Sequence, residues 1–183
     1  CFYTLNIHGG EAQFAFAVPY KAVKMKKAGK KLVLTVKYDY NKPDLSHMEE
    51  GEEKKAALKA WKEEKDYEVF DELPFWGNGQ GYTNAKRNRY AVYDMGSDKL
   101  TYVADEWTDC SQYSVLGNLL LYKAYPWKQS VMGIRPGVYL YNLSTGETKT
   151  LIAPDSMRTG VVSLLDEKTA LIAATDDSYK DTT

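Results

Sequence analysis

Three segments of this chain share one pattern, an apolar stretch followed by a tight turn and a second strand. Glycine, asparagine and aspartate gather at each turn, where they supply the positive φ angles that a short hairpin requires. The pattern therefore predicts a β-hairpin in each segment, and its recurrence predicts a repeat architecture. The three segments are residues 3–11, 90–98 and 139–147.

A second predicted hairpin follows each of these three at nearly the same distance. Its turn falls at Gly29, Gly117 and Asp166, which lie 19, 19 and 20 residues beyond the end of the corresponding first turn. Three matching intervals rarely arise by chance. They indicate that one structural unit is used three times.

The distance between successive units predicts the architecture. The first turns recur after 88 and then 48 residues, and a four-stranded blade of a β-propeller takes about 40–50 residues. The second interval corresponds to one blade. The first interval is 40 residues longer, and these additional residues are assigned to an insertion at residues 41–80. Six hairpins give twelve strands, or about three blade-equivalents. The sequence predicts an all-β fold in which residues 1–183 form part of a single β-propeller of four-stranded antiparallel blades, an arc and not a closed ring.

The insertion holds the one stretch with a helical pattern, at about residues 46–65. Ser46 and Glu49 match the Ser-x-x-Glu capping box, and acidic residues precede basic ones along the stretch, as the helix dipole favours. Its large apolar residues form a narrow stripe, which predicts a solvated surface helix. A lid or docking element is the alternative. The stripe consists of Met48, Leu58 and Trp61.

Composition excludes several classes of partner. The formal net charge is −1, which gives no electrostatic basis for binding nucleic acid or an anionic membrane. No apolar run approaches the roughly 20 residues of a bilayer span. Cys1 and Cys110 form no disulfide framework, which fits a reducing, cytoplasmic compartment. Because the chain begins inside a predicted strand, we expect it to be a fragment of a longer protein.

Catalytic chemistry has no recognisable signature in this sequence, and we expect no catalytic, metal or cofactor site. A serine hydrolase needs a nucleophile elbow, typically Gly-x-Ser-x-Gly, and a histidine base. The elbow is absent, and the two histidines, His8 and His47, lie far apart without metal-ligand spacing. The glycines at 77, 79 and 81 lack the Lys-Ser/Thr of a phosphate loop and predict a turn between aromatic residues. The acidic pair Asp71 and Glu72 is interpreted as a solvated loop.

Two stretches carry a family resemblance. Residues 140–147, with the strands that follow, resemble propeller blades of the prolyl oligopeptidase family. Residues 67–94 resemble the acylaminoacyl-peptidase-like branch, in which a charged helical insertion also precedes such a segment. The family's usual Ser-Pro-Asp-Gly turn is absent from this chain.

The resemblance implies an N-terminal propeller paired with a C-terminal α/β-hydrolase domain that carries a Ser-Asp-His triad. The propeller would gate access, so that only short or unfolded peptides reach the nucleophile. The expected partners are that hydrolase domain and peptide substrates. Arg87 and Arg89 are candidates for contact with a substrate carboxylate or with the hydrolase domain, and plain surface charges are the alternative.

Two functions therefore stand after the sequence alone. The first is a non-catalytic propeller segment of a cytoplasmic serine peptidase. The second is a stand-alone propeller of the TolB or WD-repeat sort that serves as a protein-binding scaffold. Because an open arc exposes blade faces that a neighbouring blade would bury, we also expect the chain to self-associate.

Overall fold

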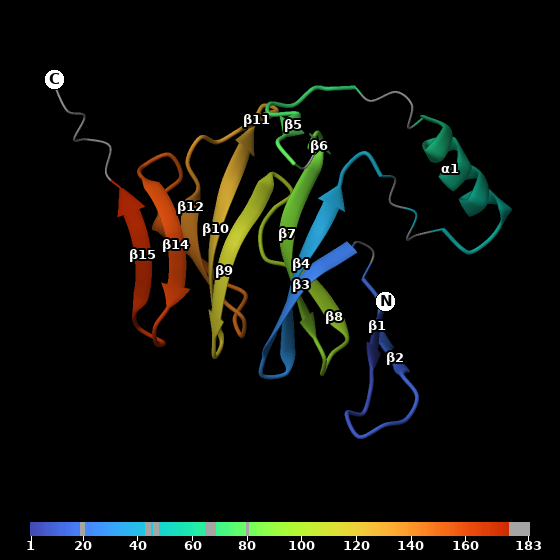
Figure 1. Cartoon of the computed structure of the whole chain (residues 1–183), viewed down its shortest axis with the longest axis horizontal. Coiled ribbons are helices and arrows are strands. Elements are labelled where there is room, and N and C mark those ends of the chain that lie inside the picture. Colours follow the sequence, from blue (N-terminus) through green and yellow to red (C-terminus); the bar gives the residue numbers. More distant parts are fainter. Residues whose placement is uncertain (19–20, 43–44, 46–47, 65–68, 80, 176–183) are drawn as a thin grey trace.

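The computed structural model confirms the all-β prediction (Figure 1). In the part of the chain that it describes, antiparallel sheets stand side by side as an arc of propeller blades, and one helix lies beside them. The described residues are 1–18, 21–42, 45, 48–64, 69–79 and 81–175.

The first blade is a four-stranded antiparallel sheet. Successive side chains point to opposite faces of a strand, and β4 is apolar on both faces. Its Leu34 and Val36 pack into one apolar cluster, whereas Val33 packs into another on the opposite side. The blade is therefore covered on both sides, which explains the almost unbroken apolar run in β4. In sheet order, the strands are β3 (Lys21–Ala28), β4 (Lys31–Asp39), β7 (Lys86–Asp94) and β8 (Lys99–Tyr102).

The second blade repeats this design. Its strand β10 sends Leu120 and Tyr122 into the cluster shared with the first blade, and Leu121 into a third cluster on the far side. The same alternation thus covers both faces of a second sheet. In sheet order, its strands are β9 (Thr108–Leu116), β10 (Leu119–Lys128), β12 (Gly137–Asn142) and β13 (Thr148–Ile152).

A two-stranded hairpin stands at each end of the arc (Figure 1). Together the two hairpins supply the strands of one further blade, so the total matches the predicted three blade-equivalents. Each predicted turn separates two paired strands. The strands of the hairpins are β1 (Phe2–Thr4) with β2 (Gln13–Phe16), and β14 (Arg158–Leu164) with β15 (Ala170–Thr175).

Blade boundaries fall in the middle of the repeat unit seen in the sequence. The second hairpin of one unit joins the first hairpin of the next, so β3–β4 continues into β7–β8. β4 and β7 pair without irregularity from Lys31 opposite Asp94 to Asp39 opposite Lys86. The intervening helical segment therefore leaves from, and returns to, the same end of one blade.

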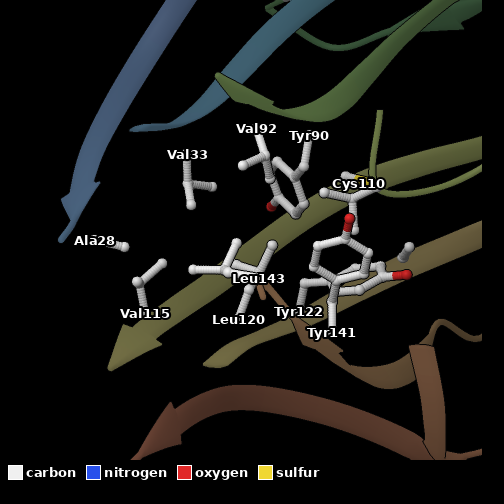
Figure 2. Packing of buried hydrophobic residues seen from close by; sticks show 12 residues of the cluster. Ala28, Val33, Tyr90, Val92, Cys110, Val115, Leu120, Tyr122, Tyr141 and Leu143 are labelled. Atoms are coloured by element: carbon white, nitrogen blue, oxygen red, sulfur yellow. The ribbon is translucent and has the colours of Figure 1, made fainter. Parts of the chain in front are cut away.

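A buried cluster between the two blades holds them together (Figure 2). Tyr90 is 1% exposed, and its ring centroid lies 5.0 Å from that of Tyr113 and 5.9 Å from that of Tyr122. Both contacts are edge-to-face, the geometry that aromatic pairs prefer. Cys110 lies in the same cluster, where burial raises the pKa of its thiol to about 12. Such a thiol is a packing residue and not a nucleophile.

Helix α1 (Glu52–Glu63) lies inside the predicted range but begins later than the capping box implied. Gly51 is the N-cap residue, and no hydrogen bond from a described side chain caps the first turn. Ser46 and His47 lie outside the described residues. None of the helical residues is buried, and Trp61 anchors the helix by donating its indole N–H to the carbonyl of Asn41 at 2.9 Å. The prediction of a surface helix is confirmed.

Apolar side chains at both ends of the arc face solvent. Tyr3 and Phe14 on the first hairpin are 63% and 62% exposed, and Val161 and Leu171 on the last hairpin are 60% and 59% exposed. Surfaces of this kind are interaction sites when they are contiguous. Each end thus presents the type of face that another blade, or a second copy of the chain, would cover.

We expect the isolated chain to self-associate through these ends, because association removes the exposed side chains from water. Light scattering coupled to size-exclusion chromatography should give a mass above 20.8 kDa that rises with concentration. A variant with both Val161→Lys and Leu171→Lys should shift toward the monomer. A wild-type chain that stays monomeric at high concentration would contradict this expectation.

Candidate functional site

A pocket of about 590 Å³ opens at one end of the two blades. Its wall is built from the end of β4, the start of β7, the start of β9 and the end of β10, together with three short strands. The short strands gather at the upper edge of Figure 1, on the side from which the segment leading to α1 departs. They are β5 (Trp76–Gly77), β6 (Gly81–Tyr82) and β11 (Val131–Met132).

The β5–β6 hairpin closes one side of this pocket. Gly79 and Gly81 have φ angles of 73° and 75°, which only glycine adopts readily. The ring centroid of Phe70 lies 5.1 Å from that of Phe75 and 5.0 Å from that of Tyr82. This aromatic cluster packs against the hairpin and stabilises it. The predicted glycine-rich turn between aromatic residues is confirmed.

Arg87 lines the pocket, but its side chain is only 1% exposed. Its Nη1 and Nη2 donate to the two carboxylate oxygens of Glu72 at 3.0 and 2.5 Å. The guanidinium also lies 3.7 Å from the ring centroid of Trp127, in cation–π geometry. Arg87 is therefore a buried anchor, and the interpretation as a plain surface charge is wrong.

Glu72 is the ion-pair partner of Arg87, and its side chain is only 9% exposed. The interpretation of Glu72 as part of a solvated loop is therefore wrong. Its Oε2 also accepts the backbone N–H of Ala85 at 2.7 Å. Burial raises the pKa of this carboxyl, but the bonds from Arg87 and Ala85 outweigh burial and hold the pKa below its usual value of 4.5. The ionised pair ties the segment before β5 to the start of β7.

Arg89 is buried as well, at 9% exposure, and it is not a plain surface charge either. Its Nη2 donates to the carbonyl of Ala104 at 2.8 Å, and the guanidinium lies 4.0 Å from the ring centroid of Tyr102. Arg87 and Arg89 are thus held by different partners, and only Arg87 reaches the pocket wall.

Lysines dominate the charged rim of the pocket. Lys21 and Lys37 lie directly opposite each other on β3 and β4, and Lys42 and Lys86 stand nearby on the same wall. Like charges placed opposite each other across two strands are destabilising. Within the described part of the chain, no carboxylate forms an ion pair with Lys21, Lys37 or Lys42. Sequence reasoning missed these lysines, which come from three separate stretches.

Two aspartates, Asp39 and Asp109, share the wall with the lysines. Asp109 accepts the backbone N–H of Asn88 at 2.7 Å, which fastens β9 to β7 at the pocket floor. Burial raises the pKa of Asp109 against the lowering effects of Asn88 and Arg87. Its carboxylate therefore has a structural partner, and the exposed lysines Lys21, Lys37 and Lys42 give the lining a positive charge.

The described ranges hold neither a cluster of metal-ligand side chains nor a membrane-spanning helix. No three His, Cys, Asp or Glu side chains among these residues gather as a metal site. His8 is exposed beside its hairpin turn. No helix formed by the described residues is long and apolar enough to cross a bilayer.

The strands and their pairing define a partial β-propeller, and solved structures share this fold. Two of them are Pyrococcus horikoshii acylaminoacyl peptidase, in an orthorhombic crystal form and in an uncomplexed form. They align with TM-scores of 0.53, at 11% and 10% sequence identity, over 95% and 96% of this chain.

This chain spans 27% of the length of each of those peptidase chains. No family model and no curated protein matches the sequence. At such low identity the likeness concerns the fold. At that level, the resemblance to acylaminoacyl peptidases stated from the sequence is confirmed.

Proposed function

We propose that this chain is the propeller segment of a cytoplasmic serine peptidase of the acylaminoacyl-peptidase type. In this role it performs no chemistry. It gates the passage of peptides to a C-terminal hydrolase domain, which is its partner within the longer protein. Residues 41–80 are an insertion into the propeller in this proposal.

One observation carries the proposal. The alignment covers 95% of this chain and 27% of an acylaminoacyl peptidase structure. A propeller segment that accounts for only part of a peptidase fits a division of labour in which another part holds the nucleophile. The two unpaired cysteines fit a reducing compartment.

The test is made on the full-length polypeptide that contains this segment. We expect it to hydrolyse short N-acylated peptides, to lose this activity with a serine-directed inhibitor, and to act far more slowly on folded proteins that contain the same cleavable sequence. The isolated 183-residue chain should show no turnover on the same peptides.

A different pattern would overturn the proposal. If the full-length polypeptide has no Gly-x-Ser-x-Gly elbow and no hydrolase activity, the chain is a binding propeller of the scaffold class. If the full-length enzyme cleaves folded and short substrates equally well, the propeller is not a gate.

A further inference from the structure

We propose that the pocket between the ends of the two blades is a binding site for a small ligand that joins an aromatic ring to an anionic group, a carboxylate or a phosphate. This proposal does not rest on the proposed function, because it is argued only from the residues that line the pocket. The pocket's volume, about 590 Å³, lies within the range of roughly 300–1,000 Å³ typical of small-molecule sites.

The case for an anion rests on the lysine rim. Lys21 and Lys37 face each other across β3 and β4, an arrangement that costs stability when nothing lies between the amines. Lys42 adds a third amine on the same wall. Within the described ranges, none of these three forms an ion pair with a carboxylate. A bound anion would offset the repulsion between the amines of Lys21 and Lys37. This part of the pocket therefore favours an anionic ligand.

Arg87 explains why the anion is received by lysines. Its two terminal nitrogens are already bonded to Glu72, so its charge is neutralised inside the wall. The face of its guanidinium is also engaged, because it stacks on the ring of Trp127. The arginine therefore shapes the floor, and the exposed lysine amines remain as donors.

The case for a ring rests on the aromatic surfaces beside that rim. Trp76 and Tyr82 on the β5–β6 hairpin line the pocket, yet they are 54% and 55% exposed. Tyr125 and Met132 line the pocket from the second blade. A flat ring seated among these side chains would bury apolar surface and gain ring–ring contact energy. Residues that meet the two requirements, a ring and an anion, line the same pocket.

The experiment is calorimetric titration of the chain with three probes. N-acetyl-phenylalanine carries a ring and a carboxylate, phenyl phosphate carries a ring and a phosphate, and N-acetyl-phenylalaninamide is the neutral match of the first. We expect at least one of the two anions to bind about tenfold more tightly than the amide, as bonds to charged groups would give. The probe that binds distinguishes a carboxylate from a phosphate ligand.

Variants assign the binding to this pocket. Lys37→Gln and Lys42→Gln should each weaken the anion several-fold and leave the amide unchanged, whereas Trp76→Ala should weaken all probes together. Lys149→Gln, on the exposed strand β13, is the control and should change nothing. Lys37→Gln should melt no earlier than the wild type, because it removes a like-charge contact.

Three outcomes would overturn the proposal. The first is equal affinity for the anions and the amide, and the second is no binding of any probe to a folded chain. The third is a Lys149→Gln variant that weakens the anion as much as Lys37→Gln does.

Discussion

Replacing Glu72 with alanine is expected to lower the free energy of unfolding by about 3–5 kcal/mol, the range found when one partner of a buried ion pair is removed. The substitution leaves the guanidinium of Arg87 buried without its two carboxylate bonds, and it takes the acceptor from the Ala85 N–H. Urea unfolding followed by circular dichroism measures the change. Segment 69–79 should also lose its tie to β7.

The neighbouring carboxylate provides a matched control for that measurement. Asp71 is exposed, so Asp71→Ala should change stability by less than about 0.5 kcal/mol, as is usual for surface substitutions. A double variant with Glu72→Leu and Arg87→Met should recover much of the loss, since apolar groups of similar size can replace a buried pair. Equal effects of Glu72→Ala and Asp71→Ala would contradict the role given to the ion pair.

The pH dependence of this effect has a defined sign. The folded-state pKa of Glu72 is lowered from 4.5, so its contribution to stability is present above that value and is lost as the pH falls through the folded-state pKa. The stability difference between the wild type and Glu72→Gln should therefore narrow below about pH 4.5. A difference that stays constant under acid would show that ionised Glu72 is not what stabilises the segment.

Leu120→Ala is expected to cost about 2–5 kcal/mol, as substitutions that leave cavities in a core do. Leu120 is fully buried in the cluster that joins the two blades, so truncation removes contacts from both sheets at once. The same urea unfolding experiment measures this loss. Because the cluster is shared, the two blades should still unfold in one transition.

Leu171→Ala is the control for the core variant. Leu171 lies on β15 with 59% of its surface exposed, so the same chemical change should cost far less there. If the two leucine variants lost equal stability, Leu120 would not lie between the blades.

The sequence was sufficient for the twelve strands of the predicted hairpins and for their turns, because their determinants are local; the short strands β5, β6 and β11 were not predicted. Gly29 and Gly117 have φ angles of 59° and 54°, which only a few residue types tolerate, and each joins two strands of 8 to 10 residues. The start of the helix was predicted wrongly for a related reason. Ser46 and Glu49 match a local capping pattern, but the first helical residue is Glu52, and the charges that begin the helix also fit a start at Gly51.

The candidate site could not be predicted because its residues meet only through long-range pairing. Glu72 and Arg87 approach each other because the β5–β6 hairpin turns the chain back between them. Lys21 and Lys37 become neighbours only once the register of β3 and β4 is set. An isolated acidic pair or lysine looks like any solvated residue in the sequence. The one sequence signal for this site was a charged residue at the end of a strand, next to an apolar run. That signal is weak.

The pairing of β4 with β7 is the most direct consequence of the blade architecture, and nuclear Overhauser effects measured by NMR test it. We expect cross-strand effects between the backbone protons of Val33 and Val92, and between those of Thr35 and Tyr90, which lie opposite each other in the first blade. Effects that pair β4 with any strand other than β3 and β7, or their absence in a folded sample, would contradict the propeller arc on which the site and both proposals depend.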